Sequence, residues 1–152
     1  MAGDALELFY SYARADERLR DQLDKHLKLL QHEGFLRSWY DRNISAGKLW
    51  DKEIRTHLNA AHIILLLISA DFLDSDYCDE VEVQEALRRH RAGEARVIPV
   101  ILRPCDWESS FGYLQALPKN GKPVTKWLNR DAAFTDIAKG IRRVIEEMHH
   151  SL

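Results

Sequence analysis

The hydrophobic positions of this chain change spacing repeatedly, from short unbroken runs to stripes that recur every three or four residues. The clearest run is Ile63 to Ile68, six apolar residues that are typical of a central parallel strand covered on both faces. The clearest stripe consists of the leucines at positions 19, 23, 27 and 30, which share one face of a helix. Because runs and stripes alternate, the pattern predicts a parallel sheet with helices on both sides.

This alternation predicts five strands, the last of them a short edge strand. Pro99 removes one backbone donor from the fourth strand, which indicates a strand start, a bulge or a locally unpaired position. Five parallel strands favour the flavodoxin-like α/β fold, with strand order 2-1-3-4-5 and right-handed crossovers. The expected strands are 6–10, 35–40, 63–68, 96–102 and 122–127; the expected helices follow Asp16, span 50–61 and 78–90, and begin again at Asp131.

Length and composition describe an ordinary globular chain. Its 152 residues suit a single domain over 1–152, which can be a segment of a longer multidomain protein, and the 45% hydrophobic and 30% charged residues argue against disorder. A net charge of −2 without a basic cluster argues against a nucleic-acid partner, and no apolar run approaches the length of a membrane helix. The two cysteines, Cys78 and Cys105, and the lack of a signal-like start predict a cytoplasmic protein.

Candidate chemistry gathers where the first and third strands end, the edge at which open α/β sheets bind ligands. Carboxylates and a cysteine follow Ser69 within a few residues. A phospho-acceptor receiver would need an acidic pair after the first strand, but the segment Phe9–Tyr12 contains no carboxylate. A dinucleotide fold or P-loop would need glycines in the same turn, and 11–14 has none. Neither a phospho-acceptor site nor a glycine-rich phosphate site therefore accounts for the polar residues at this edge.

Three segments, in order and at the right elements, resemble the Toll/interleukin-receptor (TIR) domain family, and the bacterial members most of all. Leu8–Tyr12 resembles the family's first box, and 41–50 resembles its BB loop leading into a helix with Glu53 and Ile54. The stretch from Ser69 to Glu82, with Asp71, Tyr77 and Cys78, resembles the third signature. The similarity covers nearly the whole chain, from about residue 6 to residue 148.

The resemblance implies an enzyme, an NAD⁺ nucleosidase. Bacterial and plant TIR domains cleave the nicotinamide–ribose bond, giving nicotinamide with ADP-ribose or a cyclic ADP-ribose isomer, and bacterial members serve antiviral defence or signalling. One glutamate on the helix after the third strand carries the reaction. A single carboxylate suffices chemically, because nicotinamide leaves as a neutral molecule and needs no proton donor, whereas glycosidases that expel an alcohol pair an acid with a second carboxylate. NAD⁺ is the substrate, and no cofactor is expected.

Glu82 is the favoured catalytic residue, and Glu80 and Glu85 are the alternatives. Many relatives place this glutamate three residues after the cysteine, where this chain has Val81, whereas Glu82 stands four residues after Cys78. All three acids could instead be solvated helix residues that pair with nearby arginines. By resemblance, the substrate contacts would be Tyr10, Ser11, Tyr12, Arg14, Trp39, Asp41, Ser69, Phe72, Tyr77 and Cys78.

Assembly is the second expectation that the resemblance carries. The BB loop is more often an assembly surface than a catalytic part, and catalysis in this family often depends on neighbouring domains that close the site. The expected partners are therefore NAD⁺ and other TIR domains. The alternative function is a non-catalytic adaptor module that mediates homotypic TIR–TIR interactions, as animal receptor and adaptor members do. The loop comprises Arg42, Asn43, Ile44, Ser45, Ala46, Gly47 and Lys48.

Overall fold

The computed structural model of the protein describes residues 5–39, 50–74 and 80–150, and within them the sheet has four parallel strands. The strand order β2-β1-β3-β4 confirms the flavodoxin-like α/β arrangement. β3 is buried at every position, as its apolar run predicts. The strands are β1 (Leu6–Ser11), β2 (Leu36–Trp39), β3 (Ile63–Ile68) and β4 (Arg96–Ile101).

The expected fifth strand at 122–127 is wrong. Val124–Lys126 forms a 3₁₀ helix, η4, in which Val124 is buried. Pro123, directly before it, has no backbone donor for a ladder, and one hydrogen bond, from Thr125 N to Leu102 O at 3.1 Å, joins this turn to the end of β4. The position next to β4 is instead taken by Leu117, which makes one isolated parallel bridge with Val100.

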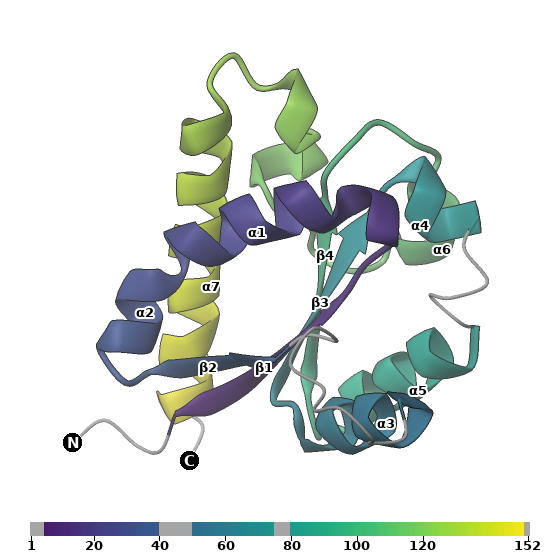
Figure 1. Ribbon diagram of the computed structural model, residues 1–152, viewed down its shortest axis with the longest axis vertical. Coiled ribbons are helices and arrows are strands. Elements are labelled where there is room, and N and C mark those ends of the chain that lie inside the picture. Colours follow the sequence, from purple (N-terminus) through teal and green to yellow (C-terminus); the bar gives the residue numbers. More distant parts are fainter. Residues whose placement is uncertain (1–4, 40–49, 75–79, 151–152) are drawn as a thin grey trace.

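Helices cover both faces of the sheet (Figure 1). On one face lie α1 (Glu17–His26), α2 (Lys28–His32) and the long α7 (Arg130–His150). On the other face lie α3 (Trp50–Ala60) and α5 (Glu80–Arg91). The short helices α4 (Ala70–Asp74) and α6 (Glu108–Phe111) and the 3₁₀ turns η1 (Arg14–Asp16) and η3 (Lys119–Gly121) lie in the connections.

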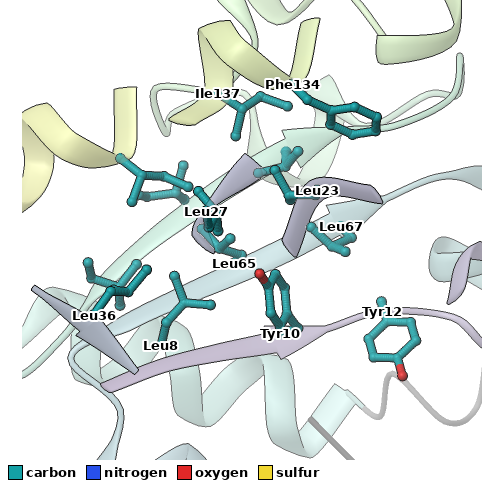
Figure 2. Packing of buried hydrophobic residues seen from close by; sticks show 14 of the residues in the cluster. Leu8, Tyr10, Tyr12, Leu23, Leu27, Leu36, Leu65, Leu67, Phe134 and Ile137 are labelled. Atoms are coloured by element: carbon teal, nitrogen blue, oxygen red, sulfur yellow. The ribbon is translucent and has the colours of Figure 1, made fainter. Parts of the chain in front are cut away.

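Each face of the sheet has its own hydrophobic core, because successive strand residues point to opposite sides. Leu8, Tyr10 and Tyr12 of the first strand and its extension pack toward α1 and α7, together with Leu23 and Phe134 (Figure 2). Phe9 and Ala13 point the other way and pack with residues of α3 and α5. This alternation decides which face each candidate site residue can serve.

Two glycines with positive φ follow helices in this fold. Gly34 follows α2 with φ of +80°, and Gly93 follows α5 with φ of +74°. This left-handed conformation closes a helix and is costly for residues with a side chain. Both turns lead directly into the next strand, so they fix where β2 and β4 begin.

The outer edge of β4 explains Pro99. Residues 97, 99 and 101 direct their backbone polar groups away from β3, so an N–H group at any of these positions needs an acceptor outside the sheet. The Val97 N–H donates to His90 Nδ1 at 3.0 Å, Pro99 has no N–H, and the Ile101 N–H donates to Leu117 O at 2.8 Å. Pro99 is therefore an edge-strand proline inside the strand, not at its start or at a bulge.

Candidate active site

The carboxyl ends of β1 and β3 form the switch point of this sheet, because the chain proceeds in opposite directions from these two neighbours. η1 follows β1 and α4 follows β3, so polar side chains from both turns meet there. Among the described helices, none is long and apolar enough to span a membrane. In the same residues, no group of three or more His, Cys, Asp or Glu side chains is arranged to hold a metal ion.

A buried carboxylate lies at this switch point. Asp16 is 1% exposed, accepts a hydrogen bond from Ser69 Oγ at 2.5 Å, and pairs with Arg103 Nε at 2.9 Å. Arg103 also pairs with Asp71 at the start of α4. The pKa of Arg103 is raised, first by its hydrogen bond to Asp16 and then by Asp71. These ion pairs keep the guanidinium charged.

A helix follows Asp16, as the sequence predicts, but the Asp16 carboxylate does not cap that helix. Asp16 occupies the N-cap position of α1, but its side chain makes no capping hydrogen bond. Its carboxylate reaches across the sheet edge to Ser69 and Arg103 instead. Sequence reasoning left Arg103 in an irregular stretch and gave it no role, because its partners are remote in sequence.

Ser69 and Phe72, both predicted substrate contacts, build the turn from β3 into α4. Ser69 is fully buried, and its Oγ accepts the Phe72 N–H at 3.1 Å, so it caps the short helix. Phe72 is 3% exposed and packs in the core beneath α3 and α5. Both side chains are buried structural parts of this turn, and their contact with substrate stays a prediction.

Tyr10 and Tyr12 lie on the α1 face of the sheet, not on the α5 face (Figure 2). Tyr10 is 2% exposed, and its hydroxyl donates to Asp24 Oδ1 at 2.8 Å. The Arg20 guanidinium lies over both rings, 5.2 and 5.7 Å from their centroids. Burial first, and then Asp24, raises the pKa of Tyr10 well above its ordinary value. Tyr10 therefore packs in the core in this structure, and its contact with substrate stays a prediction.

Trp39 ends β2 on the opposite face, within an aromatic wall. Its ring stacks on Phe9 with centroids 5.6 Å apart and on His57 of α3 with centroids 4.2 Å apart. His57 Nε2 lies 3.8 Å from Glu53 Oε2 one turn earlier in α3. Trp39, which the resemblance makes a substrate contact, therefore belongs to an ordered stack that joins β1, β2 and α3.

Glu82 lies in the first turn of α5, on the same side of the sheet as Trp39, and is half-buried. Because α5 leads back toward the start of β4, its first turn lies toward the carboxyl edge of the sheet. Its neighbour Val83 packs into the core. Glu85, an alternative catalytic acid, forms an ion pair with Arg88, as the solvated-helix interpretation expects.

The remaining predicted residues are placed only in part. Ser11 is buried and, by strand alternation, points to the α3 and α5 face, whereas Arg14 is exposed on η1. Trp39, Phe72 and the helix that carries Glu82 therefore lie on the same face of the sheet as Ser11, and the two tyrosines lie on the other face. The Glu80 side chain and several predicted residues lie outside what the structure describes, namely Asp41, Arg42, Asn43, Ile44, Ser45, Ala46, Gly47, Lys48, Tyr77 and Cys78.

A cavity of about 490 Å³ lies elsewhere, along the outer edge of β4. Its lining includes His90, Arg96, Tyr113 and Arg143, and it contains none of the predicted site residues. We place the candidate site at the carboxyl edge of the sheet nevertheless, because the buried charge and the polar turns are there. The β4 cavity has charged groups of its own, including the Arg96–Glu147 ion pair at 3.2 Å, but it lies away from the switch point.

Comparisons with known proteins agree with this fold. The family model of the TIR domain matches residues 8–146. The chain is 52% identical over 136 residues to the uncharacterized protein y4lF of Sinorhizobium fredii; the match covers 89% of the chain but only 42% of that longer protein. This relative therefore extends well beyond the matched region.

Solved structures with the same fold come from distant TIR domains. The TIR domain of the Toll-related receptor TRR-2 from Hydra magnipapillata superposes with a TM-score of 0.65 at 17% identity, covering 93% of this chain and 99% of that one. The RPS4 and RRS1 TIR domain heterodimer gives 0.58 at 12% identity, with coverages of 92% and 97%. The TIR domains of the activated Roq1 resistosome give a TM-score of 0.53 at 17% identity, covering 89% of this chain and 84% of that one. By its family match, this chain belongs to the TIR domain family.

Proposed function

We propose that this TIR domain is an NAD⁺ nucleosidase that cleaves the nicotinamide–ribose bond, with Glu82 as its catalytic carboxylate. Membership of the TIR family supports an NAD⁺-cleaving or an adaptor function in general. The observation that favours the enzyme is the half-buried carboxylate in the first turn of α5, on the face that also holds Trp39. An anion near a helix N-terminus is stabilised by about 0.3–1 kcal/mol at an exposed site, which favours the ionised form.

The proposed reaction needs one anion and no general acid. The bond between ribose C1′ and the pyridinium nitrogen breaks, and its electron pair neutralises the nicotinamide, which leaves without a proton. The oxocarbenium-like ribose that remains is stabilised by the Glu82 carboxylate. Water then adds to C1′ and releases one proton, giving ADP-ribose. Capture by an adenine nitrogen of the same molecule would instead give a cyclic isomer.

Trp39 and Ser11 are the described residues best placed to shape the substrate site. Trp39 provides an aromatic wall at the end of β2, and Ser11 ends β1 on the same face. Arg14 is exposed on η1, where its charge could meet a phosphate. Tyr10 and Tyr12 have no direct part in this proposal, because both are buried on the other face.

Self-association is the second part of the proposal. Two of the similar solved structures are TIR assemblies, a heterodimer and a resistosome, which supports association between TIR domains here. We expect the loop 41–48 to contribute to it. Assembly through these contacts would activate cleavage, in a cytoplasmic bacterial protein that acts in antiviral defence or signalling. The same structures favour the alternative, a non-catalytic adaptor that only associates with other TIR domains.

Nicotinamide release by the native chain tests the enzyme against the adaptor. We would incubate NAD⁺ with protein from sub-micromolar to high micromolar concentration and separate the products chromatographically. The proposal expects nicotinamide, with a specific activity that rises with protein concentration as assemblies form. The accompanying product distinguishes hydrolysis from cyclisation. If the protein releases no nicotinamide even when it is concentrated on a surface to force assembly, the enzyme proposal is wrong and the adaptor function is favoured.

A further inference from the structure

The three charged residues at the switch point form a bridge between η1, α4 and the end of β4. Arg103 follows β4 and contacts two carboxylates, Asp16 through Nε at 2.9 Å and Asp71 through a terminal nitrogen. We propose that Arg103 is a positioning residue of the active site, which holds α4 against the buried Asp16 and so fixes the turn that carries Ser69 and Phe72. This inference rests on the proposed function.

Burial makes Asp16 the fixed end of this bridge. At 1% exposure its carboxylate needs compensation for lost hydration, which Ser69 Oγ and the Arg103 guanidinium supply. Asp71 has a side chain 51% exposed and could remain solvated without a partner. Asp71 therefore does not need Arg103 to compensate for lost hydration. The effect of this contact is to connect α4 to the Arg103 guanidinium, which the buried Asp16 holds in place.

The backbone makes this bridge rigid. The Ser69 hydroxyl donates a hydrogen bond to Asp16 and accepts one from the Phe72 N–H. Ser69 therefore connects the first turn of α4 to the buried Asp16 carboxylate. The Leu102 N–H donates to Ile68 O at 2.9 Å, which fixes the end of β4 beside the end of β3. Arg103 therefore extends from a fixed backbone toward the start of α4.

A direct role of Arg103 in binding the substrate's phosphates is the competing explanation. Two carboxylates surround the single guanidinium, so the trio carries a formal charge of −1. An incoming anion would meet this excess charge and would have to displace a carboxylate. The guanidinium fork also suits two separate carboxylates through different nitrogens, which a single ammonium group cannot reproduce. The geometry thus favours positioning over phosphate binding.

The test compares Asp71→Asn, Arg103→Gln and Arg103→Lys with Arg142→Gln, which removes a half-exposed surface pair with Glu33 and serves as the control. We expect Asp71→Asn and Arg103→Gln to lower kcat roughly tenfold with little change in KM, because a shift of the turn at Ser69 and Phe72 would disturb the orientation of the bound substrate, which costs rate. Arg103→Lys should recover only part of kcat. Asp71→Asn leaves the pair of Arg103 with buried Asp16 intact, so it remains informative if Arg103→Gln fails to fold.

Peptide hydrogen exchange over 69–74 provides a readout independent of turnover. We expect faster exchange in Asp71→Asn, with exchange in α7 unchanged and no effect of Arg142→Gln. Unchanged exchange and unchanged kcat in Asp71→Asn would overturn the inference, and a rise in KM alone would assign Arg103 to substrate binding instead. If the native chain released no nicotinamide, the proposed function would fail, but hydrogen exchange would still test the role of Arg103. Unchanged exchange over 69–74 in Asp71→Asn would show that the contact with Arg103 does not hold α4.

Discussion

The substitution Tyr10→Phe separates the core packing that the structure shows for Tyr10 from the substrate contact that the resemblance predicts. It removes one hydroxyl from a fully buried ring and leaves the ring itself in place. That hydroxyl donates to Asp24 Oδ1 at 2.8 Å, while Lys28 at 3.1 Å and Gln31 at 3.2 Å keep contact with the same carboxylate. A hydrogen bond to a charged group contributes about 1.5–3 kcal/mol, and the two remaining partners reduce the expected loss to about 1–2 kcal/mol.

The expected loss depends on pH with a defined sign. Burial of Asp24 opposes ionisation, but the Tyr10 hydrogen bond and Lys28 outweigh it, so the pKa of Asp24 is lowered from 3.8. A carboxylate with a depressed folded pKa stabilises the fold above its unfolded pKa and loses this contribution as pH falls through the folded value. The difference between native protein and Tyr10→Phe should therefore be full at neutral pH and shrink below about pH 4.

Equilibrium unfolding in urea, followed by tryptophan fluorescence, measures this difference. The matched control is Tyr113→Phe, which removes the same hydroxyl from a side chain 65% exposed and should change stability by less than about 0.5 kcal/mol. The packing role also predicts unchanged KM for NAD⁺ in Tyr10→Phe. Equal stabilities for the two variants, or a severalfold rise in KM without loss of stability, would refute this reasoning and return Tyr10 to the substrate site.

Three further predictions concern packing, a helix end and the edge of the sheet. Leu23→Ala, at a fully buried position, should lower the free energy of unfolding by about 2–5 kcal/mol in urea unfolding. Gly93→Ala should cost roughly 1 kcal/mol because φ is +74°, and Gly93→Asn less, as thermal melts would show. The pKa of His90 is lowered, first by burial and then by Arg96 and Arg91, so its contribution to stability is lost as pH falls below about 6.5. His90→Asn keeps an acceptor for the Val97 N–H, and its unfolding free energy should vary less between pH 7 and 5 than that of the native chain.

The elements that depend on local spacing were predictable from the sequence. The apolar run of β3 and the leucine stripe of α1 and α2 both appear where the pattern places them. The fifth strand failed because Val124 is buried by a 3₁₀ turn over β4, a use of an apolar residue that periodicity does not distinguish from a strand. Pro123, immediately before it, was the signal against a strand that could have been read.

The candidate site was predictable as a place but not as a set of contacts. Strand alternation puts Tyr10 and Tyr12 on one face, yet the sequence alone does not say which face carries the catalytic helix. Asp16 fits a local capping pattern, whereas its actual partners are 53 residues away at Ser69 and 87 residues away at Arg103. A buried charge finds its partner through the tertiary fold, so no spacing rule along the chain identifies this cluster.

The ratio of nicotinamide release by Glu82→Gln to that by Glu85→Gln tests the central claim most directly. Both substitutions remove one carboxylate from α5, three residues apart, and Glu85 is the acid that pairs with Arg88. The account predicts loss of turnover by at least about a hundredfold in Glu82→Gln and near-native turnover in Glu85→Gln, measured in the same assembled state. Near-native turnover in Glu82→Gln, with loss in Glu85→Gln or in Glu80→Gln, would contradict it.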